Sequence, residues 1–77
     1  MTDLDVVTVD VRDDIRAGRE PFQRIMAAAA SLRDGQALEV INVFEPVPLY
    51  EVMRQRGFAH RTDRTPDGDW RVLFYRE

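Results

Sequence analysis

The sequence predicts a two-layer α/β sandwich of the α+β type, with the element order βαβαββ and two helices on one face of a four-stranded mixed sheet. Three observations predict this fold. Residues 6–11 are rich in valine, which is typical of a β-strand. Residues 22–32 carry apolar side chains at helical spacing. Residues 65–68 have the turn sequence Thr-Pro-Asp-Gly and lie between two further strand-like runs. The first strand–helix–strand unit should be a right-handed parallel crossover, and the last two strands an antiparallel hairpin.

The first half of the chain predicts a strand followed by an amphipathic helix. Alternate valines of residues 6–11 share one face of the strand. Residues 13–19 form a charged connection, and Pro21 suits the first turn of a helix, where its missing N–H costs nothing. The buried stripe of this helix is predicted to comprise Phe22, Ile25, Met26, Ala29 and Leu32.

The second half predicts one more strand, a helix and the hairpin. Residues 36–42 are strand-like, and Pro48 opens a helix that Gly57 ends. The buried positions of this helix are predicted to be Leu49, Val52 and Met53. Residues 58–63 and 70–75 then form the two strands of the hairpin.

Both faces of the predicted hairpin carry large apolar side chains. One face carries Phe58, Trp70, Val72 and Phe74, and the other carries Leu73 and Tyr75. We expect Trp70 to pack in the core under the helices. The second face is either the ordinary apolar part of a protein surface or an exposed sheet face that pairs with another chain, for example in a homodimer.

Composition excludes several classes of protein. The 77 residues make a single domain, 1–77, and the absence of cysteine excludes disulfides, thiolate nucleophiles and cysteine-ligated metal sites. All eleven basic residues are arginine, so lysine chemistry is excluded, and a net charge of −3 gives no general attraction to nucleic acid. No apolar run approaches the ~20 residues that span a bilayer, so we expect a cytoplasmic protein without a membrane partner.

No residue pattern indicates catalysis. His60 is the only histidine, and it lies in a strand-like run without the spacing of a metal site, so we expect a half-exposed sheet residue. No pair of acids has a spacing diagnostic of general acid–base chemistry. We therefore expect no catalytic, cofactor-binding or metal-ligating residues, no cofactor and no enzymatic activity.

The starts of the two predicted helices form a candidate binding rim. Its residues are Arg12, Arg19, Glu20, Pro21, Glu45, Pro46 and Pro48. Two helix N-termini that point the same way favour an anion or an acidic side chain. The alternative is that Arg12 and Glu45 simply pair with each other and hold the turn.

Several short motifs arrive in one order along nearly the whole chain. They are Asp10-Val11-Arg12, Glu20-Pro21, Gly35, Glu45-Pro46-Val47-Pro48-Leu49, Arg56-Gly57-Phe58 and Gly68-Asp69-Trp70-Arg71-Val72. Together they resemble the uncharacterised "domain of unknown function 2249" family, a cysteine-free relative of the SirA/TusA-like domains. The resemblance implies the fold derived above, which is that of the C-terminal domain of translation initiation factor three.

The resemblance also bears on function. Sulfur-carrying relatives have a cysteine just before the helix start, where Gly18 stands here, and a persulfide needs a thiol. Many members have an Asp-Pro-x-Pro-Leu motif after a histidine; here Glu45 and Phe44 occupy those places. We expect a non-enzymatic binding or accessory domain whose partner is another protein, and the resemblance implies a setting in redox or nitrogen-oxide metabolism. The alternatives are an RNA-binding module by fold analogy, against which the acidic charge counts, and a regulatory protein-interaction domain.

Overall fold

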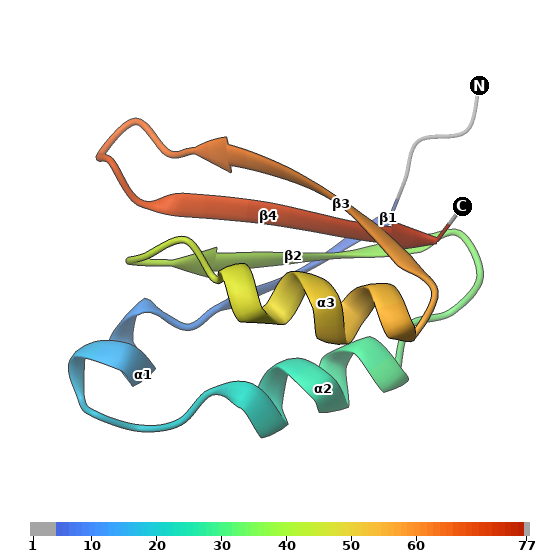
Figure 1. The fold of residues 1–77 in the computed structure, drawn as a ribbon, viewed down its shortest axis with the longest axis horizontal. Coiled ribbons are helices and arrows are strands. Elements are labelled where there is room, and N and C mark those ends of the chain that lie inside the picture. Colours follow the sequence, from blue (N-terminus) through green and yellow to red (C-terminus); the bar gives the residue numbers. More distant parts are fainter. Residues whose placement is uncertain (1–4, 77) are drawn as a thin grey trace.

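The computed structural model describes residues 5–76, which form one sheet and three helices (Figure 1). The strands are β1 (Asp5–Asp10), β2 (Gln36–Asn42), β3 (Phe58–Arg64) and β4 (Trp70–Arg76). The helices are α1 (Arg12–Arg16), α2 (Phe22–Ala30) and α3 (Val47–Gln55). The sheet order is β1-β2-β4-β3, with β1 parallel to β2 and β4 antiparallel to both of its neighbours. The predicted mixed sheet and terminal hairpin are therefore confirmed.

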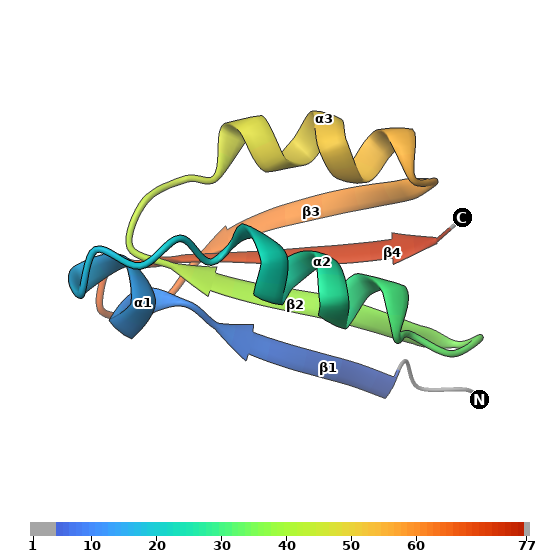
Figure 2. The same ribbon diagram turned by 90° about the horizontal axis from the view of Figure 1, so that it is seen from below.

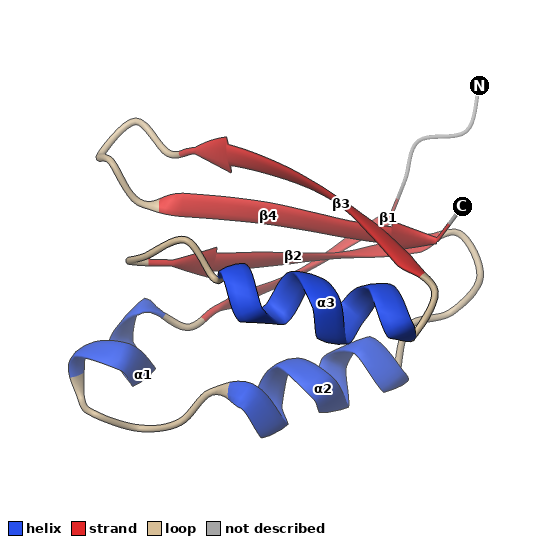
Figure 3. Cartoon of the chain, viewed as in Figure 1, coloured by secondary structure: helices blue, strands red, loops and turns tan. Residues whose placement is uncertain are grey.

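The two long helices cover one face of the sheet and leave the other open. Figures 1 and 3 show both helices on the same side of the four strands. Figure 2 shows α2 running along β1 and β2 while α3 accompanies β3, and both helices begin at the same end of the molecule. This end also holds α1, so α1 and the start of α2 meet there with the start of α3, which is distant from them in sequence.

The short helix α1 replaces the connection that was predicted between β1 and α2. Asp13 and Asp14 lie in its first turn and Arg16 in its last, which is the charge order that a helix dipole favours. Gly18 follows at φ +74°, and its N–H donates to the carbonyl of Ile15 at 3.0 Å. A helix of five residues is too short to produce a recognisable apolar period, which explains why the sequence pattern did not indicate it.

The core lies between the sheet and the helices. Its largest fully buried side chains are Val11, Leu38, Val40, Met53, Val72 and Phe74. The predicted stripes of α2 and α3 are confirmed at Ile25, Ala29, Leu49 and Met53, whereas Met26 and Val52 are half-buried. Phe22 was predicted to be buried and is 41% exposed, because it begins α2 at the open end of the sandwich.

Trp70 does not pack in the core, so that prediction is wrong. Trp70 is half-buried and lies outside the core cluster, while Val72 and Phe74 on the same strand are buried as predicted. The guanidinium of Arg64 lies over the Trp70 ring, 4.2 Å from its centroid. Trp70 is the first residue of β4, at the end where the helices begin, so less of the helix layer covers it.

Candidate functional site

An apolar cleft opens between the N-terminal halves of α2 and α3. Its volume is about 320 Å³. Its walls are formed by Ile15, Arg19, Glu20, Pro21, Phe22, Ile25, Asn42, Phe44, Pro46, Pro48, Leu49 and Val52. We call it the helix-start cleft. It draws on α1, α2, α3, the end of β2 and the loops between them, so the fold assembles it from two stretches of the chain, residues 15–25 and 42–52.

The structure divides the seven residues of the predicted rim into two groups. Arg19, Glu20, Pro21, Pro46 and Pro48 line the helix-start cleft. Arg12 and Glu45 do not belong to its lining and make contacts elsewhere. The predicted pairing of Arg12 with Glu45 does not occur among the described residues.

Arg12 instead binds three aspartates. Its Nε and Nη2 donate to the two carboxylate oxygens of Asp10 at 3.0 and 2.8 Å. Its Nη1 donates to Asp69 at 2.9 Å and lies 3.5 Å from Asp67. These hydrogen bonds raise the pKa of Arg12 and lower the pKa of Asp10. Arg12 therefore ties the end of β1 to the turn between β3 and β4, and its charge is fully engaged.

Glu45 belongs to a separate polar cluster, which joins the loop before α3 to α3 and β3. Its carboxylate accepts a hydrogen bond from the Tyr50 hydroxyl at 3.0 Å, and that hydroxyl lies 2.6 Å from the Thr62 hydroxyl. Burial raises the pKa of Tyr50. His60 is exposed and stacks on the Tyr50 ring with centroids 3.9 Å apart, so its position is explained by an aromatic contact between β3 and α3.

The charged residues at the mouth of the cleft make hydrogen bonds within the chain. Asp14 accepts hydrogen bonds from Arg19 at 2.9 Å and from Arg24 at 2.7 Å, and these arginines lower the pKa of Asp14. Glu20 accepts a hydrogen bond from the N–H of Phe22 at 3.0 Å and so caps the start of α2. Arg19 is thus engaged with Asp14, whereas Glu20 is bound by a backbone N–H and has no ion pair among the described residues.

The start of α3 offers no N–H group to an anion. The N–H of Val47 donates to Glu45 and that of Leu49 to Pro46, at 2.9 and 3.0 Å, while Pro48 has none. The start of α3 therefore gives no support to the anion site that was predicted from two helix N-termini. The geometry favours an uncharged apolar group instead.

Exposed apolar side chains gather around the helix-start cleft. Four large hydrophobic side chains of the described residues are exposed, namely Val6, Phe22, Phe44 and Val47. Phe22 and Phe44, at 41% and 48% exposure, line the cleft, and Val47, at 55%, begins α3 beside it. Sequence reasoning missed this feature, because helical spacing marks Phe22 as apolar but does not reveal that no other element covers it.

Asn42 is the one polar residue in the cleft wall that is buried. It is 3% exposed and ends β2 on the side of the sheet that faces the helices. Its side-chain oxygen accepts a hydrogen bond from the N–H of Val43 at 2.7 Å. No sequence pattern singles it out, because asparagine at a strand end is an ordinary turn residue.

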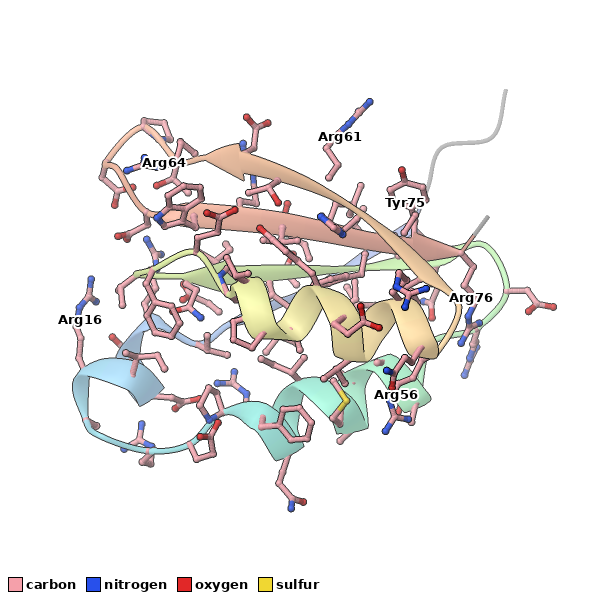
Figure 4. The ribbon with its side chains drawn as sticks, in the orientation of Figure 1. Arg16, Arg56, Arg61, Arg64, Tyr75 and Arg76 are labelled. Carbon is pink, nitrogen blue, oxygen red and sulfur yellow. The ribbon has the colours of Figure 1, made fainter. Side chains whose placement is uncertain are left out.

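The open face of the sheet is more polar than the cleft. A shallow hollow on it is lined by Val6, Glu39, Arg61, Asp63, Arg71 and Leu73. Glu39 accepts a hydrogen bond from Thr8 at 3.1 Å and lies 3.8 Å from Arg71. Figure 4 shows Arg61 and Tyr75 projecting on the side of the sheet opposite to the helices. Charges therefore alternate with apolar side chains on this face.

Comparison with known proteins identifies a family. A family model described as "Uncharacterized conserved protein (DUF2249)" matches residues 8–76. Neither the curated proteins nor the solved structures include a match to the chain.

Within residues 5–76, no three acidic, histidine or cysteine side chains are grouped so as to hold a metal ion, and no helix is both long and apolar enough to span a membrane.

Proposed function

The chain belongs to this family of uncharacterized conserved proteins, and we propose that it is a non-enzymatic binding domain whose helix-start cleft receives an apolar segment of another protein. The observation that carries this proposal is the clustering of exposed hydrophobic side chains. Three of the four described examples surround one cleft, and contiguous exposed apolar surface is typical of protein interaction sites.

The shape of the apolar surface supports a protein partner. A cleft of about 320 Å³ is at the small end of the usual range for ligand sites, so it accommodates one or two side chains. Val47 is exposed but does not line the cleft. A small molecule bound within the cleft would therefore leave the Val47 side chain uncovered. A peptide segment with an anchoring side chain covers both parts.

RNA binding receives less support from the same surface. Single-stranded nucleic acid is bound by a basic groove with aromatic side chains on which bases stack. Phe22 and Phe44 are exposed, but Arg19 and Arg24 nearby are both held by Asp14. The net charge of −3 adds a general repulsion of phosphates.

The setting that we propose for this binding is an accessory role in redox or nitrogen-oxide metabolism. It rests on the resemblance of the chain to the family, although Phe44 and Glu45 depart from the family's motif, and the geometry of the cleft is neutral on it. Genes for nitrogen-oxide enzymes beside the gene for this protein would support that setting, whereas ribosomal neighbours would favour the RNA alternative.

A peptide selection tests the binding proposal. Random peptides displayed on phage are selected for binding to the wild-type protein, and the dissociation constants of the selected peptides are measured. We expect the selected peptides to carry a hydrophobic anchor residue. The Phe44→Ser substitution should raise their dissociation constants at least tenfold. Val6→Ser removes an apolar side chain of similar exposure from the open sheet face and should leave binding unchanged. Selected peptides whose affinity falls with Val6→Ser and not with Phe44→Ser would overturn the proposal.

A further inference from the structure

The buried amide of Asn42 adds a polar requirement to the apolar cleft. Buried polar side chains in folded proteins almost always have hydrogen-bond partners. Asn42 is the one polar or charged residue among the described residues that is buried, at 3% exposure. It lies in the cleft wall together with Phe44, Pro46 and Leu49.

The hydrogen bond to Val43 fixes the orientation of this amide. The N–H of Val43 is a donor, so the Asn42 atom that lies 2.7 Å from it must be the oxygen Oδ1. The nitrogen Nδ2, with two protons to donate, is therefore turned away from Val43. Within residues 5–76, Oδ1 is the only atom of this side chain that has a hydrogen-bond partner.

The Nδ2 group borders solvent, and the helix-start cleft is the space that the structure places beside Asn42. No side-chain nitrogen or oxygen of the described residues is both sealed from solvent and without a partner. Nδ2 has no protein partner, so it keeps access to solvent, and the helix-start cleft is the space that Asn42 lines. An occupant of the cleft would displace this solvent and leave Nδ2 unsatisfied unless the occupant supplies an acceptor.

We infer that the segment bound in the helix-start cleft presents a backbone carbonyl to Nδ2 of Asn42, next to its hydrophobic anchor. This inference rests on the proposed function and names the chemistry of the partner. A neutral carbonyl suits the site better than a carboxylate, because Arg19 is already paired with Asp14 and the burial of an unpaired charge is costly. The cleft thus selects an apolar side chain together with an acceptor at one defined place.

Two small probes separate the apolar and the polar part of this recognition. N-acetyl-phenylalanine N-methylamide carries an aromatic ring and carbonyl acceptors, whereas ethylbenzene carries the ring alone. Titration of each probe is followed through the backbone amide signals of Ile25, Phe44 and Leu49 by nuclear magnetic resonance. In the wild-type protein we expect the amide to bind about three- to tenfold more tightly than ethylbenzene, which is the worth of one hydrogen bond.

The variant Asn42→Asp tests the donor directly. Aspartate keeps an acceptor for the N–H of Val43 and removes the Nδ2 donor. The preference for the amide probe should disappear, and ethylbenzene should bind as it does to the wild-type protein. If the variant does not fold, the wild-type protein still decides, because the Nδ2 protons of Asn42 should shift downfield with the amide probe and not with ethylbenzene.

The outcomes distinguish the two proposals. If neither probe perturbs the cleft residues, the proposed function fails together with this inference. If both probes bind with equal affinity and the Nδ2 protons do not respond, the cleft is an apolar site and only the inference about Asn42 is overturned. If phenylacetate binds more tightly than the amide, the cleft takes a carboxylate and the inference is wrong about the neutral acceptor.

Discussion

The carboxylate of Asp14 accepts a hydrogen bond from the guanidinium of Arg24 at 2.7 Å, which joins α1 to α2. Arg19 donates to the other carboxylate oxygen at 2.9 Å. The side chain of Asp14 is 15% exposed, so solvent screens these contacts less than an ordinary surface ion pair. Asp14 therefore fixes the loop that carries one wall of the helix-start cleft, and it does so by using charges that a ligand would otherwise meet.

The stability of the protein should depend on the ionisation of Asp14. Arg19 and Arg24 lower its pKa in the folded state, so its contribution is complete above the ordinary aspartate pKa of about 3.9 and is lost as the pH falls through the lowered value. Asp14→Asn should lower the melting temperature at neutral pH and flatten its decline in acid. Asp13→Asn is the control and should change both much less, because the Asp13 side chain is 94% exposed and lies 3.6 Å from Arg16 in a solvated ion pair. If the melting temperatures of the wild-type and Asp14→Asn proteins fell in parallel as the pH is lowered, Asp14 would not be the group responsible.

Replacement of Gly18 should destabilise the protein through its backbone alone. Gly18 has φ +74°, and a Cβ at this position would have no other atom within 4 Å. Gly18→Ala should therefore cost about 1–2 kcal/mol, the price of a left-handed conformation for an L-residue. Gly18→Asn should cost less, because asparagine tolerates this conformation, and urea unfolding of the two variants measures the difference. Equal stability of the wild-type protein and Gly18→Ala would show that the chain relaxes here.

Trp70 and Phe74 should differ in what their removal costs. Phe74 is fully buried, so Phe74→Ala should destabilise the protein by about 3–5 kcal/mol. Trp70 is half-buried under Arg64, so Trp70→Ala should cost about 1–2 kcal/mol, in proportion to the apolar area that it buries. Denaturant midpoints at constant m-value measure both. A cost for Trp70→Ala equal to that for Phe74→Ala would place Trp70 in the core.

The sequence was sufficient to predict the sheet, the hairpin and the two long helices, because each has a period, a start and an end that local residues determine. Residues 36–42 became β2 with the predicted bounds, and Gly57 ends α3 with a left-handed φ of 91°. The errors concern burial, which depends on what the rest of the fold places over a residue. Phe22 and Trp70 carry the correct pattern for burial, but both lie at the end of the sandwich where the second layer is incomplete.

The candidate site was predicted in part. Position along the chain brought Pro21, Pro46 and Pro48 together correctly, because both helices had to begin at one end of the sheet. The partners of the rim arginines could not be predicted, because the hydrogen bonds of Arg12 to three aspartates and of Arg19 to Asp14 are tertiary choices among many acids. Burial of Asn42 was equally invisible, since it depends on what covers the end of β2.

The open sheet face should not hold two copies of the chain together. A stable dimer buries about 800 Å² on each partner around an apolar centre. On this face Val6 is the one exposed large hydrophobic side chain among the described residues, and the charged side chains of Glu39, Arg61 and Asp63 surround the hollow beside it. We therefore expect a monomer in sedimentation equilibrium at micromolar concentration. A dimer that Leu73→Glu dissociates would contradict this expectation and show that the face pairs with a second copy, whereas a dimer that Phe44→Ser dissociates would place the contact at the helix-start cleft.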